Sequence, residues 1–333
     1  MIAKAARAVL TAFLVGLAAL AVWLARSLSD PWPGPGGRVV FVVEKGQSVR
    51  GVAAGLEKQG VVPDAAAVTL AYDLFWSSES LKAGEYEFVF PLRPKDAVFK
   101  ILRGRIYLHP VTIPEGLTVD ETGAILRGRV RGSFAAAALN TSLVSGWDPS
   151  ASDLEGYLFP DTYHIPAEAS ADEVVSGMAA QFRKVFTAEW EARAAALGMS
   201  VRQVVTLASL IEKETARPEE RPLVSAVFHN RLRLGMKLDC DPTIIYALKR
   251  DGRYSGRLLS RDLAYASAYN TYLHPGLPPG PICSPGRDSL EAALFPADED
   301  YLYFVAQSDG RHHFSRSFAE HQEAVRRYIL QKK

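Results

Sequence analysis

The feature that most constrains the fold of this chain is an uncharged apolar segment near its N-terminus, from Ala8 to Ala25. Lys4 and Arg7 precede the segment, and Arg26 follows it. A helix needs roughly 20 apolar residues to cross a bilayer, and this segment reaches that length with its flanks. An apolar segment of this length either spans a membrane or belongs to a targeting signal that is cleaved.

The length of the segment favours a retained anchor over a cleaved signal peptide. The apolar region of a signal peptide is usually shorter, and a small-residue cleavage site follows it. Here the small-x-small candidate, Ala19-Leu-Ala21, lies inside the apolar segment. We therefore expect a transmembrane helix over residues 8–26. By the positive-inside rule, residues 1–7 form a cytoplasmic tail and the remaining chain lies outside.

The composition describes a folded protein with a balanced charge. The chain has 333 residues, of which 48% are hydrophobic and 23% charged, enough for a full core and about two domains. Its 38 Lys and Arg residues nearly equal its 37 Asp and Glu residues. No basic excess points to nucleic acid, so we expect no nucleic-acid partner.

Cysteine and histidine spacing gives no sign of a metal site. Cys240 and Cys283 stand far apart, and no His-x-x-x-His pair falls on a helical pattern. We expect no metal and no cofactor. The two cysteines could form one disulfide or remain free thiols, and the sequence leaves both alternatives open.

The order of patterns predicts an α+β fold in two parts after the anchor. Residues 27–37 are rich in Pro and Gly and read as a linker. Residues 38–104 show a strand, two helices and a strand, which indicates a small βααβ domain. From residue 105 to 333 helical patterns dominate, with strands expected near Ile106–Ile113 and Tyr301–Val305.

A capping box at Ser200 and Gln203 predicts a helix from Val201 to about Arg217-Pro218. Its last turns carry two acids, Glu212 and Glu214.

These two acids lie about 160° apart around the axis, so they cannot share one site. A carboxyl at the end of an apolar helix can stay protonated near neutral pH, as cleavage of a glycosidic bond requires. Periodicity prefers Glu214 only slightly over Glu212 and leaves the choice open. The alternative is a solvated helix end, with Lys213 and Arg217 screening both acids.

Six motifs carry a resemblance to a known family. In order, they are Leu154-Glu-Gly-Tyr-Leu-Phe-Pro-Asp-Thr-Tyr163, Ile211-Glu-Lys-Glu-Thr215, Val227-Phe-His-Asn-Arg-Leu-Arg-Leu-Gly-Met236, Asp241-Pro-Thr-Ile-Ile-Tyr246, Tyr269-Asn-Thr-Tyr272 and Gly276-Leu-Pro-Pro-Gly-Pro-Ile282. In this order and spacing, residues 39–330 resemble the YceG-like family of endolytic murein transglycosylases. Residues 105–333 would then form the YceG-like catalytic domain.

A second, shorter resemblance concerns residues 38–104. Their strand, helix, helix, strand order, with Val43-Glu-Lys-Gly-Gln-Ser48, resembles the LysM family of glycan-binding modules. The resemblance implies a glycan-binding domain. The alternative is a small α+β spacer without a ligand.

The YceG-like resemblance implies that Glu214, the second Glu of Glu-Lys-Glu-Thr, is the catalytic acid. Thr215 would take the place of the Ser that follows the catalytic Glu in soluble lytic transglycosylases. His229, Cys240 and Cys283 look like local variation, and we expect none of them to contact the proposed acid.

Aromatic faces, amides and carboxylates are the groups that usually line glycan grooves. The expected substrate-binding residues are Glu155, Tyr157, Asp161, Thr215, Asp241, Tyr246, Asn270 and Tyr272. Some of them have a structural alternative: core packing for Tyr157 and Tyr246, a turn for Asn270, and a helix N-cap for Asp241-Pro242.

The family implies cleavage between N-acetylmuramic acid (MurNAc) and N-acetylglucosamine (GlcNAc) to give 1,6-anhydroMurNAc ends, with no water consumed. It also implies a bacterial inner-membrane protein that acts on the periplasmic side. There it would cut nascent peptidoglycan beside peptidoglycan synthases and end strand elongation.

Three other functions compete with this interpretation. A serine acyl-transfer enzyme lacks its motifs here, since Ser209 and Lys213 are not in Ser-x-x-Lys spacing. A non-enzymatic, membrane-anchored scaffold that binds peptidoglycan remains the main alternative. A hydrolase that uses water differs only in its product.

Overall fold

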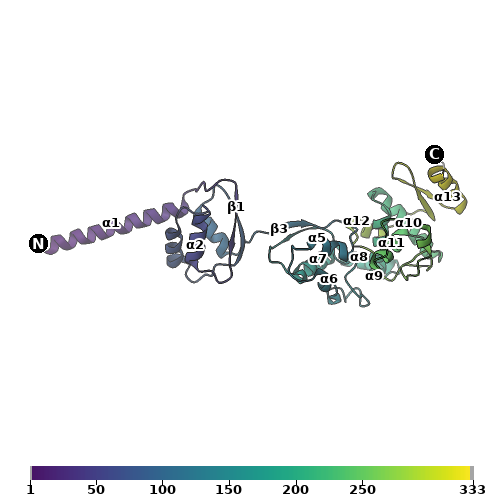
Figure 1. The fold of residues 1–333 in the computed structure, drawn as a ribbon, viewed down its shortest axis with the longest axis horizontal. Coiled ribbons are helices and arrows are strands. Elements are labelled where there is room, and N and C mark those ends of the chain that lie inside the picture. The colour runs from purple at the N-terminus through teal and green to yellow at the C-terminus, as the bar shows by residue number, and fades with distance from the viewer. Residues whose placement is uncertain (1, 331–333) are drawn as a thin grey trace. The chain divides into compact units, whose positions relative to one another are not determined.

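A computed structural model describes residues 2–330 of the chain (Figure 1). The chain divides into two compact units. The first unit runs to Pro110 and includes His164–Glu168, and the second comprises Val111–Tyr163 and the chain from Ala169 onward. The architecture is a mixed α+β one, as the sequence predicts.

The apolar N-terminal segment forms one long helix, α1 (Ile2–Ser29), long and apolar enough to cross a membrane. This is consistent with a single-pass membrane anchor. The helix continues beyond the expected end at residue 26, because its last two turns have a globular partner. Leu24 and Leu28 are buried in the core of the first unit, where α1 contacts α3 (Ala65–Ala71) and α4 (Pro94–Leu102).

The first unit packs helices against a two-stranded sheet. After α1, its elements are β1 (Arg38–Val43), α2 (Val49–Lys58), α3, η1 (Tyr72–Trp76), β2 (Gly84–Val89) and α4. Strands β1 and β2 pair antiparallel, with Phe41 opposite Tyr86. Alternate side chains of each strand point inward, so Phe41 and Tyr86 are buried in one cluster with α2 and α3. Ser48 caps α2 by accepting a hydrogen bond from the Gly51 amide.

The second unit is mainly helical. Including the strand pair at the boundary, its elements are β3 (His109–Thr112), α5 (Val119–Leu126), α6 (Phe134–Ala137), η2 (Thr141–Leu143), β4 (Thr162–Ile165), α7 (Ala171–Val185), α8 (Ala188–Ala196), α9 (Val201–Glu214), η3 (Pro218–Glu220), α10 (Arg221–Arg233), α11 (Asp241–Arg250), η4 (Ser260–Ala264), α12 (Arg287–Leu294), β5 (Tyr303–Ala306), β6 (His312–Ser315), α13 (Phe318–Val325) and η5 (Arg326–Leu330). Strands β3 and β4 pair with each other, and β5 and β6 form an antiparallel hairpin.

Helix α9 lies at the centre of the second unit. All side chains from Val204 to Ile211 are buried, against α8, α10, α11 and α12. The predicted capping box is present, with Ser200 and Gln203 each accepting a hydrogen bond from the other's amide. The helix ends at Glu214 and not near Arg217-Pro218, because Thr215 already has an extended backbone. The chain therefore leaves the core at Glu214.

The packing of α1 on the first unit predicts a cost for truncating Leu28, which is 7% exposed. The substitution Leu28→Ala should destabilise the first unit by about 2–5 kcal/mol, because it leaves a cavity. Hydrogen exchange of the β1 and β2 amides in the detergent-solubilised chain measures this loss. Leu20→Ala is the matched control, since Leu20 lies on the same helix and is 44% exposed. Equal effects of the two substitutions would exclude the end of α1 from the core.

Candidate active site

Glu214 is the last residue of α9, and the residue as a whole is half-buried. Burial raises its pKa to about 7. The neighbouring Asp241 carboxyl also raises the pKa. A hydrogen bond from Cys240 and the charges of His312 and Arg231 act in the opposite direction and favour the carboxylate. These neighbours come from α10, β6 and the start of α11, so the tertiary fold assembles the site around the helix end.

The second acid of the motif, Glu212, has a structural environment. Its side chain is 8% exposed, and its Oε1 lies 3.3 Å from Nη2 of the buried Arg221. Its Oε2 accepts a hydrogen bond from the Gly286 amide at 3.0 Å. Both carboxylate oxygens of Glu212 are thus occupied by groups that hold α9, α10 and α12 together. Glu212 is therefore held by structural contacts, whereas the Glu214 carboxyl has a pKa of about 7.

The expectation that Cys240 does not contact the proposed acid is wrong. The Cys240 thiol is a hydrogen-bond partner of the Glu214 carboxyl, and burial raises the pKa of this thiol well above its ordinary value. The Cys240 amide donates to Oγ1 of Thr271 at 3.0 Å, which fixes its position before α11. No local sequence pattern indicates this contact, because Cys240 precedes α11 whereas Glu214 ends α9.

The other two residues in that expectation have different partners. The Cys283 thiol donates to the Ser209 carbonyl at 3.5 Å, and His229 Nε2 lies 2.8 Å from the Ala293 carbonyl oxygen. Both cysteines are free and buried, so the free-thiol alternative holds and not the disulfide.

Asp241 and Tyr272 lie together next to this site. The Tyr272 hydroxyl donates to Oδ1 of Asp241 at 2.7 Å, and Asp241 is exposed. Asp241 is the first residue of α11, and Cys240 occupies the N-cap position without a capping hydrogen bond from its side chain. The expected N-cap therefore falls one residue earlier, and the Asp241 carboxylate remains available beside Glu214.

Glu155 and Tyr246 form a second group, which lines a cavity of about 580 Å³ together with Lys249 and Arg250. The Glu155 carboxyl accepts from the Val119 amide at 3.2 Å, and the Tyr246 hydroxyl donates to it at 3.4 Å. Burial raises the pKa of Glu155 to about 8. Helix α11 carries Asp241 at its start and Tyr246 further along, and it thereby connects the two groups.

Two expected substrate-binding residues lie in the core. Tyr157 is 1% exposed, and its hydroxyl donates to Asp148 at 2.9 Å. Asn270 is fully buried, and its amide nitrogen donates to the carbonyls of Leu263 and Tyr265. These partners occupy the polar groups of Tyr157 and Asn270, so contact with a glycan would require both side chains to rearrange.

The last two expected residues are Asp161 and Thr215. Asp161 is exposed at the start of β4, where its Oδ2 accepts from Gln181 Nε2 at 2.8 Å. Thr215 is buried, and its hydroxyl donates to Oε2 of Glu220 at 3.2 Å. The structure thus brings Glu214, Asp241 and Tyr272 together, and buried Thr215 follows Glu214 in the chain, while Asp161 has its own separate partners.

His312 and Arg231 are neighbours of Glu214 that sequence analysis missed. Arg231 is buried, and it donates to the Leu302 carbonyl at 2.7 Å and to Asp239 at 3.1 Å. Neither residue stands in a pattern with Glu214, so no local signal could have found them. Among residues 2–330, no group of three or more His, Cys, Asp or Glu side chains is arranged to hold a metal ion.

Comparison with known proteins identifies the family. The model of the YceG-like family matches residues 41–327. An endolytic murein transglycosylase of Bacillus subtilis is 31% identical over 309 residues, covering 87% of this chain and 84% of that protein. An endolytic murein transglycosylase of Streptococcus pneumoniae is 28% identical, and the match covers 88% of this chain but only 59% of that protein.

A crystal structure of a yceG-like protein from Listeria monocytogenes is also similar, with a TM-score of 0.59 and 29% identity. The similarity covers 86% of this chain and 98% of that one. The chain belongs to the YceG-like family, and the resemblance seen in its six motifs is confirmed.

The raised pKa of Glu214 predicts a stability that depends on pH. The pKa of Glu214 is about 7 in the folded state against an ordinary value of 4.5. The folded state therefore holds this proton more tightly, and its stability falls as pH rises from about 4.5 through 7. Glu214→Gln removes the effect and should stabilise the protein at about pH 8 by up to about 3 kcal/mol, with little change below pH 4.5. Urea unfolding at both pH values measures this difference.

Glu212→Gln is the matched control for this experiment. It removes the most buried of the three carboxylates that pair with Arg221, the others being Glu115 and Asp288, and should destabilise the protein by about 1–3 kcal/mol at about pH 8. If Glu214→Gln destabilised the protein in the same way, Glu214 would be a structural residue.

Proposed function

We propose that this chain is an endolytic lytic transglycosylase, a carbon-oxygen lyase that cleaves the MurNAc-GlcNAc bond of peptidoglycan. The observation that carries the proposal is that half-buried Glu214, at the end of a buried helix, has a carboxyl with a pKa of about 7. A catalytic acid works best with a pKa near the operating pH. The names of the relatives from Bacillus subtilis and Streptococcus pneumoniae support the same activity.

In the proposed reaction, Glu214 acts first as an acid and then as a base. The protonated carboxyl donates to the glycosidic oxygen while the bond from this oxygen to C1 of MurNAc breaks. The C6 hydroxyl oxygen of the same MurNAc then bonds to C1, and its proton passes to the Glu214 carboxylate. The acid is regenerated, GlcNAc leaves with a free hydroxyl, and no water is consumed. Because the attacking hydroxyl belongs to the substrate, its entropic cost is small.

The groups around Glu214 suit its change from a neutral acid to a carboxylate during this reaction. The hydrogen bond from Cys240 and the charge of Arg231 stabilise the carboxylate that exists after the first proton transfer. Before the first proton transfer, the Asp241 carboxylate favours the protonated form of Glu214. It would also stabilise positive charge on the sugar. The tyrosines and carboxylates along α11, from Asp241 and Tyr272 to Tyr246 and Glu155, would bind the glycan on either side of the cleaved bond.

The first unit would act as a glycan-binding module. Its order of β1, α2, α3 and β2 supports the LysM-like interpretation. The helix α1, with Lys4 and Arg7 near its start, would anchor the chain with its N-terminus in the cytoplasm. Both units then lie on the periplasmic side of the inner membrane, where protease added to spheroplasts reaches them. At this location, beside peptidoglycan synthases, cleavage of nascent strands would end their elongation.

The decisive experiment is muropeptide analysis after digestion of nascent peptidoglycan by the full chain in detergent. The wild-type protein should release 1,6-anhydroMurNAc ends, and Glu214→Gln should reduce their rate of formation by at least about 100-fold, because the proton donor is lost. Reducing ends, heavier by one water molecule, would identify a hydrolase, with Asp241 as the candidate base. Undiminished anhydro product from Glu214→Gln would exclude Glu214 as the acid.

The LysM-like interpretation has a separate test, because the first unit has its own core. A fragment over residues 21–108, which keeps Leu24 and Leu28, should sediment with purified peptidoglycan sacculi. Its retention should resist salt, because binding to sugar faces is not mainly electrostatic. A folded fragment that stays in the supernatant would indicate a spacer domain.

A further inference from the structure

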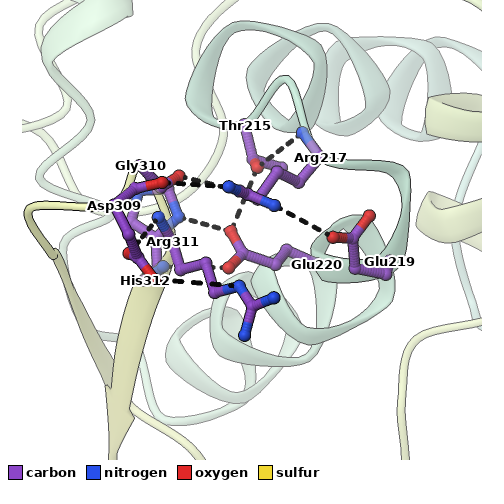
Figure 2. A network of polar contacts seen from close by, with 8 residues as sticks. All are labelled: Thr215, Arg217, Glu219, Glu220, Asp309, Gly310, Arg311 and His312. Carbon is purple, nitrogen blue, oxygen red and sulfur yellow. Dashed lines mark hydrogen bonds and ion pairs between the residues drawn. The ribbon is translucent and has the colours of Figure 1, made fainter.

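The C-terminal hairpin, which consists of β5, β6 and residues 307–311 between them, reaches the segment that directly follows the proposed acid (Figure 2). The contact centres on Glu220, which is 6% exposed. Oε1 of Glu220 accepts from the His312 amide at 2.9 Å, and Oε2 accepts from His312 Nδ1 at 2.7 Å. Glu220 and His312 lie 92 positions apart in the sequence.

The same carboxylate holds the end of α9. Thr215, the residue after Glu214, donates its hydroxyl to Oε2 of Glu220 at 3.2 Å and accepts from the Arg217 amide at 3.1 Å. Burial alone would raise the pKa of Glu220, but the hydrogen bonds from His312 and Thr215 outweigh burial and lower it. Glu220 is therefore a carboxylate that ties Thr215 to the hairpin.

A second set of contacts fixes the turn of the hairpin. Nε of Arg217 donates to the Gly310 carbonyl at 3.1 Å, and Nη2 donates to the Asp309 carbonyl at 3.0 Å. Figure 2 shows these contacts next to the Glu220–His312 pair, so two residues that follow α9, Arg217 and Glu220, meet the hairpin. Because Glu214 lies between the rigid helix and this held loop, its backbone has little freedom to move.

His312 also acts on Glu214 through its charge. Positive charge on His312 favours the carboxylate of Glu214. The other groups facing Glu214 are the Cys240 thiol and the Asp241 carboxylate at the start of α11, and the Arg231 guanidinium of α10. His312 is thus the one member of this set that also belongs to the C-terminal hairpin.

We propose that His312 and Glu220 are positioning residues for Glu214: the pair locks the C-terminal hairpin onto Thr215, fixes the acid in its working geometry and supplies a nearby positive charge. This inference rests on the proposed role of Glu214. The C-terminal hairpin, which is far from Glu214 in the sequence, would then belong to the catalytic unit.

Two substitutions at His312 separate the two effects. His312→Ala removes both the contact with Glu220 and the charge, and it should lower kcat by on the order of 10- to 100-fold with KM within about threefold, because the acid is misplaced. His312→Gln keeps a hydrogen-bond donor for Glu220 but no charge. It should recover much of kcat while the alkaline limb of the kcat/KM profile moves upward by on the order of half a pH unit. The direction follows because loss of a positive charge raises the pKa of Glu214.

His313→Gln is the matched control. His313 is the neighbour of His312 on β6, so its side chain points to the opposite face, where it packs against Tyr328. This variant should keep the rate and the pH profile of the wild type. Glu220→Gln completes a double-mutant cycle with His312→Ala, and the double variant should lose little more than His312→Ala alone, because the two side chains act as one unit.

A readout without activity separates this inference from the proposed function. The difference in unfolding free energy between each protein and its Glu214→Gln counterpart, followed against pH, reports the pKa of Glu214. The pH at which this difference inflects should rise in the His312→Gln background and stay the same in the His313→Gln background.

An inflection at an unchanged pH in the His312→Gln background would overturn the charge effect, and wild-type kcat in His312→Ala would overturn the positioning. A His312→Gln chain that does not fold also counts against the proposal, because the pair would then support the fold and not the acid. If the wild type forms no anhydro product while the inflection still moves, the proposed function fails and the coupling of His312 to Glu214 stands.

Discussion

The site depends on one constraint, the burial of a carboxyl group at the point where helix α9 leaves the core. Burial penalises the charged form of Glu214, and the partners that favour this form only partly offset the penalty. The result is a group close to the balance between acid and base near neutral pH. The other helices of the second unit maintain this burial, because α8, α10, α11 and α12 pack around α9.

Three carboxyls close together in sequence take three different environments at this helix end. Glu212 faces Arg221 and the Gly286 amide and holds helices together. Glu220 accepts hydrogen bonds from His312 and Thr215 and holds the loop after the helix. Glu214 lies between them in the sequence, and within residues 2–330 no ion-pair partner fixes it as a carboxylate. The two structural carboxylates hold the backbone on both sides of the third, which allows a half-buried acid to keep a defined position.

The first unit joins the apolar helix to the folded part of the chain. Leu24 and Leu28 of α1 pack into the same core as Phe41 and Tyr86 of the sheet. A helix that ended at the membrane surface would leave the domain on a flexible tether. Here the end of the helix is part of the hydrophobic core, so the first unit continues directly from the apolar helix.

The sequence by itself determined the features that arise from local patterns. The apolar segment predicts α1, and the Ser200 capping box sets the start of α9. A short apolar run predicts β1 and alternation predicts β2, since each depends on residues near in sequence. The end of α9 was less well predicted, because the extended backbone of Thr215 accompanies its contact with Glu220. The motifs predicted the family, which the comparisons confirmed.

Only the tertiary structure decided how the two acids of α9 differ and which groups surround them. Helical periodicity describes a face of α9, but it cannot say that Arg221 meets Glu212 or that Cys240 and His312 meet Glu214. The pKa of a carboxyl depends on the atoms that exclude water from it and on the charges around it. For Glu214 these arrive from three other elements, one of them at the far end of the chain, and only folding brings them together.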